Sequence, residues 1–167
     1  MTLALSLSSI DSPIGPLALA VDDEGAVRGA SFGPGLAAVM RREYPDADLR
    51  EGEAPASLRE ALAAYFAGRR DVLDAIPWAV QGDGFQPRVW RELARVPAGT
   101  TITYGEMARR AGEPGAAQAA GVALNRNPIP LILACHRVIG ADGALVGFGG
   151  GVERKRWLLA HEGALLL

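Results

Sequence analysis

The chain has 167 residues, enough for one ordinary domain or for two small ones. Its residues are 49% hydrophobic and 22% charged, a composition that favours a buried core and argues against disorder. The net charge of −2 gives no overall sign of a nucleic-acid partner, and the single cysteine, Cys135, excludes an internal disulfide framework and a multi-cysteine metal cluster.

The first residues alternate between apolar and small or polar side chains. Leu3, Leu5 and Leu7 share one face of a period-two pattern, which predicts a strand and not a signal peptide. No apolar run approaches the roughly 18 residues that a membrane-spanning helix needs. We therefore expect no membrane association and a cytoplasmic location.

The first half of the chain predicts strands followed by helices. Strands are expected at 3–7, 17–21 and 26–32, and a helix at 36–44 that stops at Pro45. A second helix has a capping-box pattern at Ser57 and Glu60 and closes at Gly68, with an apolar stripe formed by Leu58, Leu62, Tyr65 and Phe66. The pattern weakens between Val72 and Phe85, so we expect an N-terminal domain over 1–82 and a second domain over 83–167.

The second half opens with a helix that begins at Gln86 and Pro87 and ends near Pro97. Its apolar face consists of Val89, Trp90, Leu93 and Val96. Residues 100–103 are expected to be extended. Two short helices then follow, at 104–111 and 116–124, with a glycine-containing turn between them. This spacing is typical of a helix-turn-helix, and an ordinary helical hairpin fits it as well.

A stiff connector at 127–130 leads into the apolar run 131–133, which we expect to enter the core. Residues 138–139 and 144–146 are predicted to form a hairpin through the turn at 141–143. A glycine cluster at 147–151 precedes a last helix at 152–161, whose inward side chains are expected to be Trp157, Leu158 and Leu159.

The net charge is unevenly distributed between the two halves. Residues 1–84 hold seven basic and 13 acidic residues, a net charge of −6, whereas residues 85–167 hold ten basic and six acidic residues, a net charge of +4. DNA phosphates need a local basic face and not a basic whole, so the second half is compatible with DNA binding.

Cys135 and His136 are the candidate chemical pair. A lone cysteine in an apolar run is most often a small buried hydrophobe, but an adjacent histidine could act as the base that a nucleophilic thiol requires. Consecutive side chains on a strand point to opposite faces, so the two can cooperate only if the chain turns there or a water bridges them. Glu162 could orient the histidine, and it could equally be a solvated helix end.

Four segments of the second half resemble the O6-alkylguanine-DNA alkyltransferases. They are the Tyr-Gly-Glu-Met-Ala segment from Tyr104, the run from Asn127 through Cys-His-Arg-Val, the Val-Gly-Phe-Gly-Gly-Gly turn from Val146, and the Trp-Leu-Leu-Ala-His-Glu-Gly segment from Trp157. The match runs in order from about Phe85 to Gly163. The resemblance implies an α+β fold, with an RNase H-like N-terminal domain of strands and helices and a winged helix-turn-helix-like second domain.

The activity implied by this resemblance is irreversible, single-turnover transfer of an alkyl group from O6 of guanine, and also from O4 of thymine in some members, to Cys135. His136 would act as base through a water, Glu162 would orient His136, and Asn127 would hold the turn between the DNA-binding helix and the active site. Tyr104 would help to rotate the nucleotide and then protonate the guanine. No metal or organic cofactor is implied.

The resemblance also implies a monomer that binds alkylated double-stranded DNA from the minor groove and flips the damaged base, which is otherwise buried in the stack. The residues expected to contact DNA are Tyr104, Ala117, Gln118, Gly121, Arg126 and Arg137, of which Arg137 would also have a structural role. The residues expected to line the base pocket are Val146, Phe148, Gly149 and Gly150.

Three positions depart from the family pattern. Gln118 stands where an arginine usually fills the gap left by the flipped base, which predicts weaker DNA binding or slower flipping. Ala134 replaces the usual proline before the cysteine, which predicts a less rigid backbone, and Gly149 occupies a position that is often serine. The zinc site found in the first domain of some relatives cannot form, because no Cys or His precedes Cys135.

Two other functions remain open from the sequence. The first is an alkyltransferase-like protein that binds damaged DNA without transfer, although such proteins replace the nucleophilic cysteine. The second is a helix-turn-helix regulator in which Cys135 is structural. A thiol hydrolase on an unrelated fold is disfavoured, since no segment forms a recognisable oxyanion loop.

Overall fold

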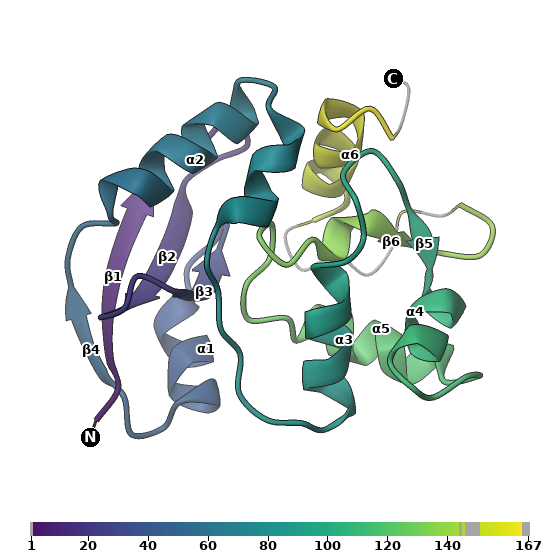
Figure 1. The fold of residues 1–167 in the computed structure, drawn as a ribbon, viewed down its shortest axis with the longest axis horizontal. Coiled ribbons are helices and arrows are strands. Elements are labelled where there is room, and N and C mark those ends of the chain that lie inside the picture. Colours follow the sequence, from purple (N-terminus) through teal and green to yellow (C-terminus); the bar gives the residue numbers. More distant parts are fainter. Residues whose placement is uncertain (1, 144, 146–150, 165–167) are drawn as a thin grey trace. The chain divides into compact units, whose positions relative to one another are not determined.

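The computed structural model describes residues 2–143, 145 and 151–164, and the chain divides into two compact units. The first unit is the chain up to Ala79 together with Pro128–Ile132, and the second is Val80–Asn127 together with the chain from Leu133 onward. Both contain helices and strands, so the expected α+β class is confirmed (Figure 1). The return of five residues to the first unit was not predicted.

The first unit is built on a four-stranded sheet. Its strands are β1 (Ala4–Ile10), β2 (Leu17–Asp22), β3 (Val27–Ser31) and β4 (Asp48–Glu51), in the spatial order β3-β2-β1-β4. The first three pair antiparallel, and β4 pairs parallel to β1. The strand β4 was not predicted, because its charged sequence has no alternation of apolar residues and lies mostly exposed at the sheet edge.

Both faces of this sheet are covered. On one face Leu5 and Ala20 pack with three side chains at helix α1 (Leu36–Glu43), namely Leu36, Met40 and Tyr44. Side chains alternate along a strand, so Leu17 and Leu19 point to the other face, and both are fully buried. The helix α1 ends before Pro45 as predicted.

The helix α2 (Ala56–Phe66) buries Leu58, Leu62 and Tyr65 of its predicted apolar stripe, whereas Phe66 is half-buried, and the helix begins differently from the prediction. Pro55 is the N-cap residue, and its carbonyl accepts hydrogen bonds from Leu58 and Arg59. Ser57 therefore lies inside the first turn, where its side chain makes no cap, and the predicted capping box is wrong. Gly68 closes the helix with φ 118°, and a 3-10 segment, η1 (Arg70–Ala75), follows.

Gly29 on β3 allows a test of the packing between the sheet and α1. A Cβ atom at Gly29 would lie 2.5 Å from Met40 Cε and 2.9 Å from Leu36 Cδ1, inside the core between β3 and α1. We expect Gly29→Ala to lower the free energy of unfolding by about 1–3 kcal/mol, the usual cost of overpacking. Urea denaturation measures this, with Gly33→Ala as the matched control because its Cβ would meet nothing within 4 Å. Equal stabilities of the two variants would contradict the packing described.

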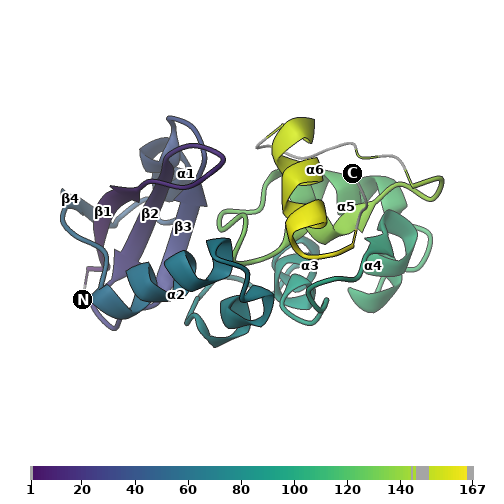
Figure 2. The ribbon, with the colours of Figure 1, turned by 90° about the horizontal axis from the view of Figure 1, so that it is seen from above.

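The second unit gathers helices around a small sheet. Its elements are α3 (Phe85–Leu93), β5 (Ile102–Thr103), α4 (Tyr104–Arg110), α5 (Ala117–Asn125), η2 (Cys135–Arg137), β6 (Val138–Ile139) and α6 (Val152–His161). Figure 2 shows α3, α4 and α5 close together. The buried Trp90 joins two of them, because its Nε1 donates to the carbonyl of Ala123 at 2.8 Å.

One prediction for this unit needs correction, and one pairing was not predicted. Val138 and Ile139 pair in parallel with β5, opposite Ile102 and Thr103. Ala144 and Val146 of the predicted hairpin lie outside the described residues. Trp157 is only half-buried and stacks on His161, with ring centroids 4.6 Å apart, whereas Leu158 and Leu159 are buried as predicted.

Candidate functional site

Cys135 is placed by a sharp change in chain direction. Ala134 has φ −79° and ψ 67°, and the Cys135 amide donates to the Leu133 carbonyl at 2.8 Å, which together define an inverse γ-turn. The 3-10 turn η2 starts at the next residue, so the chain is not a strand at Cys135. The geometric objection to cooperation between Cys135 and His136 therefore does not apply.

The backbone conformation of Ala134 bears on the predicted effect of having alanine instead of proline before Cys135. Its φ of −79° lies within the range that a proline ring fixes, and its side chain is buried. Alanine thus holds the conformation that proline would impose, which makes the expected loss of rigidity small.

Three charged or polar side chains are interlocked beside the thiol. His136 Nε2 lies 2.9 Å from Glu162 Oε2, and Arg137 donates from Nε and Nη2 to the two oxygens of the same carboxylate, each at 2.9 Å. Arg137 Nη1 donates to the Val96 carbonyl at 2.6 Å. His136 and Glu162 are completely buried. Bonds of this number and geometry are what buried charges require.

The network sets the protonation states of its members. Burial alone would raise the pKa of Glu162, but the hydrogen bonds from His136 and Arg137 and their charges hold it well below the ordinary carboxyl value. Burial lowers the pKa of His136, against the opposing effect of Glu162, so the ring is neutral near pH 7. A neutral ring that donates from Nε2 to a carboxylate carries its basic lone pair on Nδ1.

Cys135 is itself buried, with 7% of its surface exposed. Burial raises the pKa of its thiol, while a hydrogen bond with Asn127, the charge of Lys155 and nearby backbone groups act in the opposite direction. A thiol in this state needs a base before it can react, and the neutral His136 is a base of the right kind.

Tyr104 and Asn127 complete the surroundings of the thiol. Asn127 follows the end of α5, and its Nδ2 donates to the Leu133 carbonyl at 2.8 Å, which fixes the start of the turn that carries Cys135. Burial and the electrostatic effect of Cys135 raise the pKa of Tyr104, so its hydroxyl keeps its proton at neutral pH. The structure thus brings together Tyr104, Asn127, Cys135, His136 and Glu162.

The helices α4 and α5 pack against each other. Residues 111–116 connect them, and this connection contains Gly112 and Gly115 at positive φ. Along α5 the side chains of Gln118 and Val122 are exposed, Val122 to 51%. Arg126, also exposed, is the C-cap residue. Gly121 lies on this helix, and a Cβ there would meet nothing within 4 Å. Glycine inside a helix costs about 1 kcal/mol relative to alanine, and packing within the described protein gives no reason for it here.

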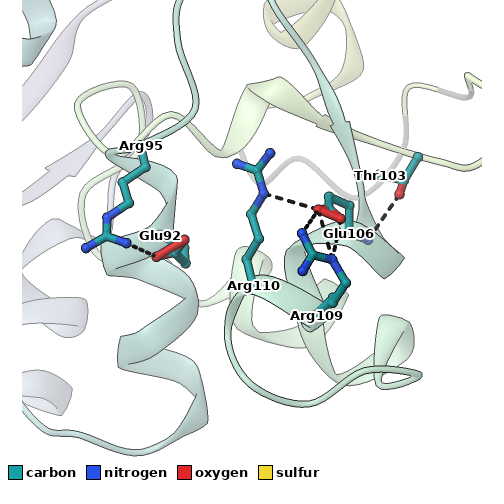
Figure 3. A network of polar contacts seen from close by, with 6 residues as sticks. All are labelled: Glu92, Arg95, Thr103, Glu106, Arg109 and Arg110. Carbon is teal, nitrogen blue, oxygen red and sulfur yellow. Dashed lines mark hydrogen bonds and ion pairs between the residues drawn. The ribbon is translucent and has the colours of Figure 1, made fainter.

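Two ion-pair clusters lie on the neighbouring helices (Figure 3). On α4, Thr103 accepts the Glu106 amide as N-cap, and the Glu106 carboxylate binds both Arg109 and Arg110, which lowers its pKa to about 2. Just after the end of α3, Arg95 Nη1 lies 3.3 Å from Oε2 of Glu92 on that helix. Two arginines share one carboxylate on α4, so that helix surface keeps a net positive charge.

Several predicted site residues have different settings from those expected. Arg137 is buried and its guanidinium is bound to Glu162 and Val96, so it is not available to a phosphate and we assign it the structural role alone. Val146, Phe148, Gly149 and Gly150, the predicted pocket, lie outside the described residues.

Lys155 is the site residue that sequence reasoning missed. It lies on α6 with 1% of its surface exposed, and its Nζ donates to the Val138 carbonyl at 2.6 Å. The signal was present in the helical spacing, because Lys155 shares a face with Leu158, Leu159 and Glu162, all of which are buried.

In the described part of the chain, no helix is long and apolar enough to cross a membrane.

Comparison with protein families gives one match to the second half. Residues 84–164 match the model described as "6-O-methylguanine DNA methyltransferase, DNA binding domain". Over nearly the whole chain, a methylated-DNA--protein-cysteine methyltransferase of Shigella flexneri is 39% identical across 170 residues, covering 99% of each sequence. A protein of the same name from Mycobacterium leprae is 46% identical across 156 residues, covering 92% of this chain and 90% of its own.

Solved structures agree with these relatives. The crystal structure of Mycobacterium tuberculosis O6-methylguanine methyltransferase has a TM-score of 0.76 and 38% identity, and the match covers 95% of this chain and 93% of that one. A structure of Mycobacterium tuberculosis OGT in complex with DNA has the same TM-score and identity and covers 98% of this chain and 93% of its own.

Proposed function

This chain belongs to the methylated-DNA--protein-cysteine methyltransferase family, and from that premise we propose that Cys135 removes alkyl groups from O6 of guanine in DNA. The protein is a DNA-repair methyltransferase that acts by direct reversal, with DNA as its partner. The observation that carries the assignment of the acceptor is that the chain's one thiol lies next to the buried network of His136, Arg137 and Glu162.

The proposed reaction is a single displacement at carbon. His136 accepts the thiol proton through a bridging water, with its basic Nδ1 toward the thiol and its Nε2 bound to Glu162. The Cys135 thiolate then attacks the alkyl carbon, a carbon–sulfur bond forms, and the bond to O6 breaks with its electron pair on the base. Tyr104 donates a proton to the departing guanine. The thioether product has no group to release it, and the chain has no second cysteine, so each molecule acts once.

DNA binding is proposed through α5 in the minor groove. Minor-groove entry requires close approach of a helix to a groove about 6 Å wide. Ala117 and Gly121 are small residues on α5, and the space around Gly121 is open. No packing within the described protein requires a glycine at position 121. A close approach of DNA to α5 would explain the small residue there. Arg126, at the exposed end of the helix, supplies a cation for a phosphate.

Several further features remain proposals. We propose an RNase H-like N-terminal domain over 1–82 and a winged helix-turn-helix-like catalytic domain over 83–167, with the α4–α5 pair as the DNA-binding motif. We also propose that the protein acts as a monomer in the cytoplasm, and that the pocket for the flipped base includes Val146, Phe148, Gly149 and Gly150. O4-alkylthymine is a further proposed substrate.

The assay for this function uses duplex DNA that contains O6-methylguanine labelled in the methyl group. We expect stoichiometric transfer of the label to the wild-type protein and none to the Cys135→Ala variant. Tight binding of alkylated DNA without transfer would instead indicate a damage-binding protein, and the absence of any preference for alkylated DNA would indicate a helix-turn-helix regulator. Both of these results would overturn the proposal.

Gln118 gives a separate prediction about DNA affinity. We propose that its side chain enters the gap left by the flipped nucleotide and hydrogen-bonds the orphaned partner base. A charged donor forms hydrogen bonds about twice as strong as a neutral one, so Gln118→Arg should tighten binding to alkylated duplex by about fivefold or more. Fluorescence anisotropy measures this. Gln81→Arg, which adds the same charge at an exposed position before α3, is the control. Equal affinities of the wild type and Gln118→Arg would sink the idea.

A further inference from the structure

Leu131 has a backbone conformation that leucine rarely adopts. Its φ is 75°, and among the residues that the structure describes it is the one non-glycine residue with a positive φ. For a residue with a Cβ atom this conformation is strained, and it persists only where the surrounding structure imposes it. Residues held in this way are often found at active sites. Leu131 precedes the reacting Cys135 by a few positions in the chain.

The surroundings of Leu131 explain how the strain is maintained. Residues 130–132 form a turn, and a proline followed by a residue at positive φ is the order found in type II turns, whose third position usually holds glycine or asparagine. The leucine side chain is completely buried, and the burial of so large an apolar group offsets the strain. A glycine would be free of strain at this position, but only a large side chain can anchor the turn in the core.

The segment that contains this turn is held by hydrogen bonds at both of its ends. At its start, the Ala30 amide donates to the Pro128 carbonyl at 2.9 Å. At its end, the Leu133 carbonyl accepts one bond from Asn127 Nδ2 and one from the Cys135 amide, each at 2.8 Å. Because one carbonyl takes both of these bonds, a rotation of the backbone two residues earlier would move it away from its donors and would move the thiol with it.

We propose that the positive φ of Leu131 places the Cys135 thiol for methyl transfer, which makes Leu131 a positioning residue. The inference rests on the proposed function and goes beyond it, because it assigns the placement of the thiol to the backbone conformation of one strained residue. A displacement of a reacting atom by about 1 Å can slow a reaction by about a hundredfold. The protein thus keeps a conformation that costs stability because the reaction requires it.

The test compares two variants that lack the leucine side chain. Glycine adopts a positive φ without strain, whereas alanine is strained there and has no large buried side chain to hold it. We expect methyl transfer from an O6-methylguanine duplex to fall by about tenfold or more in Leu131→Ala and by less than about threefold in Leu131→Gly. If Leu131 only filled space in the core, alanine would be the better replacement because it retains Cβ. Equal rates in the two variants, or a faster Leu131→Ala, would overturn the proposal.

A second readout separates misplacement of the thiol from a change in its ionisation. The chain contains one cysteine, so the rate of alkylation by iodoacetamide reports the thiolate of Cys135 alone. This small reagent does not need the alignment that a flipped base needs, so the ratio of the methyl-transfer rate to the alkylation rate should fall by about tenfold or more in Leu131→Ala. Leu62→Ala is the matched control, since it removes another completely buried leucine, from α2, and should leave the ratio unchanged. A wild-type ratio in Leu131→Ala would contradict the inference.

Urea denaturation tests the strain without DNA. The equilibrium constant for unfolding should be about fivefold to thirtyfold lower in Leu131→Gly than in Leu131→Ala, the factor that corresponds to the strain of one residue in the left-handed region. Ile129 provides the control pair, because it is equally buried and has no positive φ. There the order should be reversed, with Ile129→Ala more stable than Ile129→Gly. Greater stability of alanine at both positions would rule out the strained backbone.

A measurement on the wild type applies even if neither variant at position 131 folds. A positive φ brings the amide and α protons of one residue closer together than a negative φ does, so Leu131 should give a stronger NOE between them than Ile129 does. A weak NOE at Leu131 would overturn the inference. A wild type that transfers no methyl group would overturn the proposed function as well, whereas an active wild type with equal transfer rates in Leu131→Gly and Leu131→Ala would overturn this inference alone.

Discussion

Replacement of Glu162 by glutamine is expected to lower the free energy of unfolding by about 3–5 kcal/mol. The glutamine has nearly the same shape, but it leaves the guanidinium of Arg137 without its compensating charge in a site with almost no exposed surface. Urea denaturation at pH 7 measures the loss. Glu153→Gln is the matched control, since Glu153 lies exposed in the first turn of the same helix and its replacement should change stability by less than about 0.5 kcal/mol.

The double variant Glu162→Gln, Arg137→Met identifies the origin of this loss. Removal of both charges is less costly than removal of one, so the double variant should be more stable than Glu162→Gln alone. Methyl transfer should still be impaired in the double variant, because His136 no longer has a carboxylate to fix its tautomer. A double variant that is less stable than either single one would mean that the packing of Arg137, and not its charge, is responsible.

The same carboxylate makes stability depend on acid. The pKa of Glu162 is held well below its ordinary value in the folded protein, so its contribution is fully present above the pKa of an unfolded glutamate, about 4.3. This contribution is lost as the pH falls below that value toward the folded pKa. The urea concentration at the unfolding midpoint should therefore decrease in the wild type once the pH is lowered below about 4.3. The decrease should be smaller in Glu162→Gln. Parallel curves would show that other carboxylates, such as Asp22, dominate the acid response.

Asn127→Ala is expected to affect both stability and reactivity. The alanine removes the side-chain donor that fixes the turn before Cys135 and leaves the Leu133 carbonyl with the Cys135 amide alone, which should cost about 0.5–1.5 kcal/mol. It also removes a hydrogen bond that opposes the effect of burial on the thiol, so the pKa of Cys135 should rise further. Methyl transfer at pH 7 should consequently fall by tenfold or more. Urea denaturation and the pH profile of iodoacetamide alkylation measure the two effects.

Asn125→Ala separates this role from a general effect on the helix. Asn125 lies two residues earlier, exposed at the end of α5, and its replacement should change neither the midpoint of the pH profile nor the stability by more than about 0.5 kcal/mol. If Asn127→Ala retained the wild-type thiol profile, the amide would have no part in the activation of Cys135.

The local patterns of the sequence predicted most of the elements correctly. The alternation in the first strand, the apolar stripe of α2 and the α4–α5 pair were all confirmed within a few residues. The errors came from competing local signals. Ser57 and Glu60 had a capping pattern, but the fixed geometry of Pro55 starts the helix earlier, while a true capping pattern at Thr103 and Glu106 was overlooked.

Contacts between distant positions could be predicted only in part. Cys135 and His136 were identified by type and adjacency, but no periodicity indicated that the chain would turn between Leu133 and Cys135. The contact of Arg137 with Val96 joins residues 41 positions apart. Lys155 was missed because a charged residue in an amphipathic helix is ordinarily solvated, and the local sequence does not show which charged side chain will be buried.

The chain's brief return to the first unit limits how this protein can be shortened. The Ala30 amide donates to the Pro128 carbonyl at 2.9 Å, and Ile129 and Leu131 are completely buried. A fragment that began at Val80 would keep every residue of the thiol network but would lack the sheet against which Pro128–Ile132 packs. The apolar side chains of this segment, which precedes Cys135, would then be exposed. The second unit therefore cannot simply be produced without the first. An active shortened protein would require polar substitutions in the segment Pro128–Ile132.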